Sequence, residues 1–99
     1  MLLYVPFPSR KEAKAVSAAL IKGRLIACSN IIQSSSMYCW KEKVVRTKEF
    51  IALMKTTKTN AKAAKKAILA LHSHKIPCIL ELPARANREY GEWVLQSCR

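Results

Sequence analysis

A chain of 99 residues, of which 51% are hydrophobic, is long enough for one domain with a modest core and argues against a disordered protein. The apolar run at the N-terminus ends at Pro6, which is too short for a signal peptide or a membrane span. A net charge of +12, with 18 Lys and Arg against six Glu and no Asp, favours anionic partners. Because the lysines are spread along residues 1–99, ordinary solvated faces explain the charge equally well.

The first half of the chain predicts one helix among extended segments. Residues 2–7 form a strand that Pro6 and Pro8 close. Ser9 and Glu12 have the spacing of a capping box, in which each side chain bonds the other's backbone N–H, and Gly23 is the expected C′ residue of the helix that follows. The extended segments are expected at 25–32, at 37–40 after a polar interruption at 33–36, and at 44–57 after a turn at 41–43.

The second half predicts a helix, a strand and a last helix. Thr59 or Asn60 is the expected cap of the first helix, which carries a positive stripe of lysines on its outer side. Residues 76–82 form a strand between two prolines. Asn87 caps the last helix, whose Tyr90, Trp93 and Val94 share one face. The lysines of the stripe are Lys58, Lys62, Lys65 and Lys66.

This order of elements is β-α-β-β-α-β followed by a helix, which is typical of the α+β ferredoxin-like sandwich. A strand of thirteen residues spans about 40 Å, whereas a compact chain of this length has a radius of gyration of only about 13 Å. The central hairpin is therefore expected to extend beyond its own domain. Because its apolar upper part needs cover and its edges need partners, we expect other copies of the chain to supply both.

The four cysteines, Cys28, Cys39, Cys78 and Cys98, contain no CxxC pair, which excludes a zinc ribbon or a thioredoxin-like site. We expect small apolar thiols in a reducing compartment, and therefore a cytoplasmic protein.

The candidate metal ligands are His72 and His74, with Cys28 and Cys78 as soft partners. Imidazole and thiolate suit copper or zinc. The two histidines can share an ion only if the helix ends by Ser73, and Pro77 favours such an end. The alternative is a pair of polar residues at a helix C-terminus, where imidazole also interacts well with the helix dipole.

Tyr38 and Trp40 project from the same face of a strand, because side chains alternate along it. They are expected to pack in an assembly rather than to form the floor of a ligand pocket. Glu49 stands among basic residues and is expected to pair with a cation across subunits.

Catalysis and specific nucleic-acid binding are both disfavoured. The absence of Asp excludes a Ser-His-Asp set, and residues 5–10 lack the glycines of a phosphate-binding loop. The third extended segment, from Glu49 to Lys55, has one aromatic residue and no glycine, unlike the RNA-binding strand of an RRM. Nonspecific, salt-sensitive nucleic-acid binding remains an alternative.

Four segments in order carry a family resemblance that covers essentially the whole chain. They are Ala27–Ile31, Ser36–Trp40, Leu53–Thr57 and Leu71–Pro77, with Glu49, Leu82–Pro83, Tyr90 and Trp93 at matching places. Together they resemble the divalent-cation tolerance (CutA) family. The resemblance implies a PII-like homotrimer held by long hairpins, a role in tolerance to copper and other divalent ions, and no established catalytic activity.

The resemblance also bears on the site. It implies a ligand cleft or trimer interface that includes Tyr38, Trp40, Glu49, Lys55, Lys75 and Trp93. Of the copper ligands described in the family, only His72 has a counterpart here, because the other positions match Val5 and Leu71. Basic residues at Lys41, Arg46, Lys48 and Lys75 add repulsion for cations, which favours the alternative of a PII-like sensor that binds a small anion between subunits.

Overall fold

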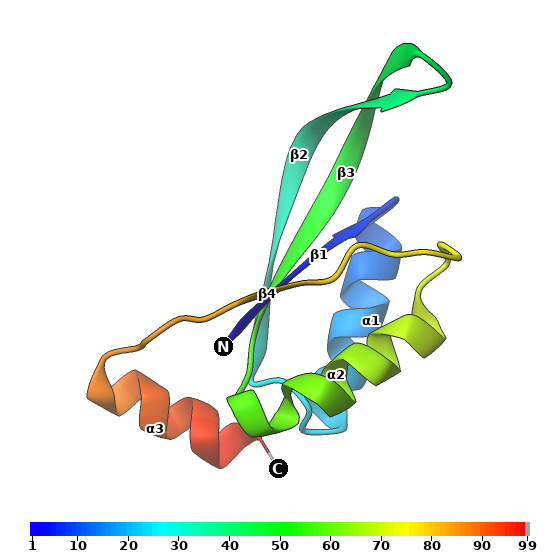
Figure 1. Cartoon of the computed structure of the whole chain (residues 1–99). Coiled ribbons are helices and arrows are strands. Elements are labelled where there is room, and N and C mark those ends of the chain that lie inside the picture. The colour runs from blue at the N-terminus through cyan, green and yellow to red at the C-terminus, as the bar shows by residue number, and fades with distance from the viewer. Residues whose placement is uncertain (99) are drawn as a thin grey trace.

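The computed structural model describes residues 1–98, which form four strands and three helices (Figure 1). In chain order these are β1 (Leu2–Phe7), α1 (Arg10–Lys22), β2 (Cys28–Trp40), β3 (Lys43–Lys55), α2 (Lys58–Leu71), β4 (Leu80–Leu82) and α3 (Arg88–Ser97). The strands form one antiparallel sheet in the order β2-β3-β1-β4. The predicted ferredoxin-like order with an added helix is confirmed. None of the helices of residues 1–98 is long and apolar enough to cross a membrane.

The core lies between one face of the sheet and the helices α1 and α2. Leu3, Val5 and Phe7 alternate along β1 and are fully buried, as alternation requires of a strand with one covered face. They meet apolar residues of both helices, including Leu20 and Ile68. Burial of each such side chain contributes about 1.5–3 kcal/mol, so this layer fixes the position of the sheet.

The hairpin of β2 and β3 projects far beyond this core (Figure 1). Each strand has 13 residues, paired from Cys28↔Lys55 to Trp40↔Lys43, and the molecule measures 46 × 25 × 20 Å. Lys41 and Glu42 form the turn with φ values of 50° and 67°, as a two-residue hairpin turn requires. The predicted overhang is confirmed.

The predicted capping of α1 is half right. The amide of Glu12 donates to the Ser9 hydroxyl at 3.1 Å, as expected. The Glu12 carboxylate does not return to Ser9, because it accepts a hydrogen bond from the amide of Ser73 at 3.0 Å. Gly23 has a right-handed φ of −78°, and Arg24 takes the left-handed conformation with φ 59°. The guanidinium of Arg24 donates hydrogen bonds to the carbonyls of Gln96 and Ser97, which offset the strain of this conformation.

The predicted interruption of the second strand is wrong, because β2 runs unbroken through residues 33–36. Residues 33–36 lie in the part of the hairpin that does not pack on the core. Polar side chains there face solvent, so they do not interrupt the strand. Residues 25–27 lie outside the strand. The amide of Ala27 instead donates to the carbonyl of Lys55 at 2.8 Å.

The predicted start of α2 is also wrong, since its cap is Thr57, whose hydroxyl accepts from the amide of Asn60 at 3.1 Å. Asn60 is buried and donates its side-chain amide to the carbonyl of Arg24. The strand predicted at 76–82 is reduced to β4. Its ladder stops before Pro6, because proline has no amide hydrogen and the Pro6 carbonyl binds His72 instead.

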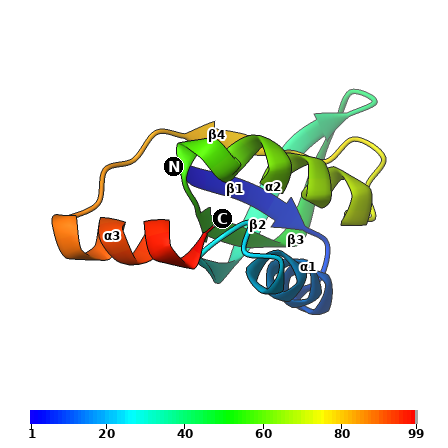
Figure 2. The ribbon, with the colours of Figure 1, turned by 90° about the horizontal axis from the view of Figure 1, so that it is seen from below.

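The last helix lies to one side of the body and does not cover the α1–α2 layer (Figure 2). It packs through Tyr90, Val94 and the residue that ends it, Cys98, against Ala27. Asn87 precedes the helix as predicted but makes no side-chain cap hydrogen bond.

Candidate functional site

The structure divides the predicted site residues between the two ends of the sheet. Tyr38, Glu49 and His74 line a groove beside the overhanging hairpin. Cys28, Lys55 and Trp93 lie at the other end, around Tyr90. The sequence does not predict this separation, because the members of each group are far apart along the chain and only the fold brings them together.

The groove beside the hairpin has a volume of about 680 Å³. The hairpin contributes Tyr38, Lys48 and Glu49, and the segment before β4 contributes His74 and Cys78. Burial, together with the charge of Glu49, raises the pKa of the Cys78 thiol above its usual range. Cys78 therefore stays protonated at neutral pH and is a poor metal ligand there, because metals bind the thiolate.

His72 is locked into the core at the C-terminus of α2. Its side chain is fully buried, its ring stacks on Phe7 at 4.5 Å, and Nε2 lies 2.8 Å from the Pro6 carbonyl. Its Nδ1 accepts a hydrogen bond from the amide of His74 at 3.0 Å. We therefore assign the neutral tautomer with the proton on Nε2. Both ring nitrogens are engaged, so His72 has no lone pair left for a metal ion.

Glu12 closes this cluster from the start of α1. Although burial favours its neutral form, the hydrogen bonds from Ser73 hold the pKa of the Glu12 carboxyl below its usual value. Its Oε2 lies 3.6 Å from Nδ1 of His72. Because that nitrogen is already an acceptor, the contact is not an ion pair in the neutral tautomer.

One chain does not assemble the predicted metal site of His72, His74 and Cys28. The rings of His72 and His74 lie 5.0 Å apart. Cys28 lies opposite Lys55, which pairs with Leu2, whereas His72 binds at Pro6. Four residues of strand, about 13 Å, separate those positions. Residues 1–98 contain no group of three His, Cys, Asp or Glu side chains placed to hold a metal ion. The described part of one chain therefore does not supply a complete set of ligands.

Tyr90 organises the other end of the sheet. Its hydroxyl accepts a hydrogen bond from Nζ of Lys55 at 3.3 Å and lies 3.4 Å from Sγ of Cys28. The ring of Trp93 lies 5.4 Å from that of Tyr90. The hydrogen bond to Tyr90 raises the pKa of Lys55 despite the opposing effect of burial, so Lys55 is cationic at neutral pH.

The face of the sheet opposite the core presents exposed apolar side chains on either side of a polar stretch. Pairing places Tyr4, Leu53, Leu80 and Ile32 on this face, and alternation along β2 adds Tyr38 and Trp40 beyond Ser34 and Ser36. Ile32, Leu80 and Trp40 are 51%, 51% and 63% exposed. Both α1 and α2 pack on the other face, so these two helices leave this one uncovered.

Two site features escape sequence reasoning. Tyr90 is recognisable only as part of an apolar helix face, although it joins Cys28 and Lys55. The contact of Glu12 with Ser73 links residues 61 positions apart. The spacing of Ser9 and Glu12 favours a local capping role, so only the packing of α1 against α2 reveals the actual contact.

The strand order, the one-sided helix layer and the overhanging hairpin define a ferredoxin-like sandwich. Residues 1–97 match the sequence profile of the family described as CutA1 divalent ion tolerance protein. The chain belongs to this family.

Individual relatives agree with this assignment. The chain is 36% identical to the divalent-cation tolerance protein CutA of Thermus thermophilus over 98 residues, which cover 97% of this chain and 95% of that protein. The crystal structure of CutA1 from Pyrococcus horikoshii superposes with a TM-score of 0.94 at 29% identity and covers 99% of this chain and 97% of the other. The PII-like protein CutA from Nostoc has a TM-score of 0.91 at 22% identity over 99% of this chain and 96% of its own, which shows the fold alone.

Proposed function

We propose that this chain acts as a homotrimeric, non-catalytic binding protein in divalent-cation tolerance. Membership of the CutA1 family supports the cation role. The observation that carries the assembly is the set of exposed apolar side chains on the sheet face opposite the helices, which includes Ile32, Leu80 and the overhanging Trp40. Exposed apolar side chains gathered on one face mark a protein interface, and family resemblance favours three copies.

A second copy of the chain is the partner that best fits this face. Both edge strands, β2 and β4, have one side without a strand partner in the chain, so each can extend a sheet across subunits. Tyr38 and Trp40 then pack between subunits. We expect Glu49 and Lys75 to pair with charged groups of neighbouring chains, and Trp93 to contribute from α3.

The divalent ion, with copper as the first candidate, is proposed to bind between subunits. His74 and Cys78 are the predicted ligands that are exposed and line the groove, and His74 is the better donor of the two because the pKa of the Cys78 thiol is raised. His72 is engaged in the core. A site shared by subunits needs one or two donors from each chain, which is compatible with the lack of a three-ligand cluster in residues 1–98. Cys28 stays a candidate only through a neighbouring subunit.

The alternative is a PII-like sensor in which the same cleft binds a small anion and metal binding is lost. Lys48 in the groove and the net charge of +12 favour it.

We place the protein in the cytoplasm, because all four of its cysteines are free. The CutA structure from Archaeoglobus fulgidus is described as periplasmic, so fractionation of the native host is the test.

Native mass spectrometry tests the assembly and the ion together. The metal-free chain is expected to be a trimer and to retain about one Cu(II) or Zn(II) per chain on titration. His74→Ala should abolish retention, while Lys62→Ala, an exposed control on α2 outside the groove, should keep it. A monomer contradicts the assembly. A trimer that binds neither ion contradicts the metal role and leaves the anion alternative, for which a thermal-shift screen of organic anions is the next measurement.

A further inference from the structure

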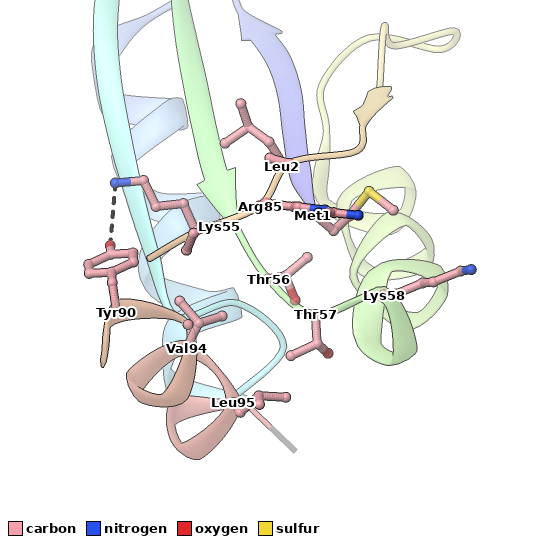
Figure 3. Close-up of a pocket in the computed structure, with 13 residues that line it drawn as sticks. Met1, Leu2, Lys55, Thr56, Thr57, Lys58, Arg85, Tyr90, Val94 and Leu95 are labelled. Carbon is pink, nitrogen blue, oxygen red and sulfur yellow. Dashed lines mark hydrogen bonds between the residues drawn. The ribbon is translucent and has the colours of Figure 1, made fainter. Parts of the chain in front are cut away.

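A second pocket lies at the end of the sheet away from the hairpin. It has a volume of about 440 Å³ and is bounded by the start of β1, the start of α2, residues 84–86 and α3 (Figure 3). This volume is within the range of small-molecule sites, about 300–1,000 Å³. None of the residues that line the groove beside the hairpin lines this pocket.

The charged groups around the pocket are all cations. Lys55, Lys58 and Arg85 line it, and none of the 13 lining residues is acidic. Figure 3 shows Lys55 beside Tyr90 on one wall, Arg85 above the opening and Lys58 on the opposite side with its ammonium turned outward. Within residues 1–98 no carboxylate forms a salt bridge with any of the three. The pocket is therefore electropositive and has no internal counter-charge.

One of these cations is held in place. Nζ of Lys55 donates to the Tyr90 hydroxyl at 3.3 Å and lies 5.2 Å from the centre of the Tyr90 ring. A fixed ammonium loses little entropy when a ligand binds. The dipole of α2 adds partial positive charge at the start of the helix, and no acidic residue in the first turn offsets it.

The floor of the pocket is apolar. Leu2, Val94 and Leu95 line it with their side chains. Gly91 of α3 also lines it and, having no side chain, takes up no space in it. An added Cβ at Gly91 would meet only the Cβ of Ala86, at 3.8 Å, which is an ordinary contact. A glycine inside a helix weakens it relative to alanine, and here the missing side chain keeps the pocket open.

We propose that this pocket binds a small organic anion, a carboxylate or phosphate monoester with an apolar body. The cations would hold the anionic group at the rim, and the apolar body would displace water from Leu2, Val94 and Leu95. The proposal goes beyond cation tolerance and stands on residues of one chain. It does not depend on the ion.

Hexanoate and hexyl phosphate are the probes, in a titration that follows the amide shifts of the assembled protein by ¹H–¹⁵N NMR. Saturable shifts are expected at Thr57, Gly91 and Leu95. Hexan-1-ol, which lacks the charge, and acetate, which lacks the body, should bind at least about tenfold more weakly.

Variants test whether the pocket cations and the open volume at Gly91 are needed for binding. Lys55→Met and Arg85→Met should each weaken hexanoate binding about tenfold, whereas Lys62→Met, an exposed lysine outside the pocket, should not change it. Gly91→Leu should block binding by filling the pocket, and Gly91→Ala serves as its fold control.

Three results would overturn the proposal. Equal affinity for hexan-1-ol and hexanoate means an apolar hollow without charge selectivity. Equal weakening by all three cation variants means diffuse attraction to a basic surface. Pocket amides that ignore hexanoate but shift on dilution mean that a second copy of the chain occupies the pocket.

Discussion

The same two strands, β2 and β3, serve two different environments along their length. In the packed half, Ala52 and Met54 of β3 are fully buried against the helix layer. In the overhanging half, Met37, Trp40 and Val44 are 62%, 63% and 58% exposed, although their residue types are those of a core. Backbone pairing is continuous through both halves.

The difference teaches that strand pairing and side-chain burial are separate requirements. The ladder extends wherever two strands can pair, but it stabilises a lone hairpin only marginally. The packed half is stabilised within the chain by α1 and α2. The overhanging half has no such layer, so its stability and its function depend on what covers it. Changes in the two halves should therefore have different readouts.

The largest effect is expected in the packed half, from Phe7→Ala. Phe7 is fully buried and stacks on His72, so its removal leaves a cavity and loosens the C-terminus of α2. The free energy of unfolding should fall by about 3–5 kcal/mol. Equilibrium urea denaturation at one fixed protein concentration measures it, since stability depends on concentration in an oligomer.

The control for Phe7 is Leu69→Ala on the outer side of α2, where the leucine is 57% exposed. Its effect should stay within about 0.5 kcal/mol. Equal losses in the two variants would show that the helix layer is not the source of stability in this half.

A smaller effect with a different readout is expected from Trp40→Lys in the overhanging half. A buried tryptophan at an interface contributes about 2 kcal/mol or more to association, and a buried lysine opposes assembly. Sedimentation velocity should show dissociation toward monomer, while amide spectra around His72 stay unchanged. Leu69→Lys makes the same change on the helix layer and should remain assembled. An intact trimer in the Trp40 variant would place the hairpin tip outside the interface.

The sequence predicts the fold well because each element carries its own local signal. Alternation in β1, the Ser9 cap and the apolar stripe of α2 all depend on neighbours within a few residues. The overhang follows from strand length alone. The errors occur where a partner from elsewhere decides the outcome, as when Pro6 and His72 together end the β1–β4 ladder.

The candidate site is less predictable for the same reason. His72 has the residue type of a metal ligand, but Pro6 and His74 occupy its two nitrogens. Cys28 and Lys55 lie opposite each other in the β2–β3 ladder, and Tyr90, which is 62 and 35 positions away, contacts both. Residue types indicate which chemistry is available, but long-range contacts decide which groups remain free to perform it.

The smallest effect is expected in the packed half, where the start of α1 meets the end of α2, from Glu12→Gln. The folded state lowers the pKa of Glu12, so the ionised form stabilises the fold above the usual carboxyl pKa of about 4.3. That stabilisation is lost as pH falls through the lower, folded pKa. Urea midpoints should therefore show the variant less stable by about 1 kcal/mol at pH near 6, with the difference shrinking toward about pH 3. Glu42→Gln, at the exposed hairpin turn, is the matched control for loss of one carboxylate. A constant difference between Glu12→Gln and the unchanged protein at all pH values would mean that Glu12 acts by shape and not by charge, and that packing alone holds α1 against the end of α2.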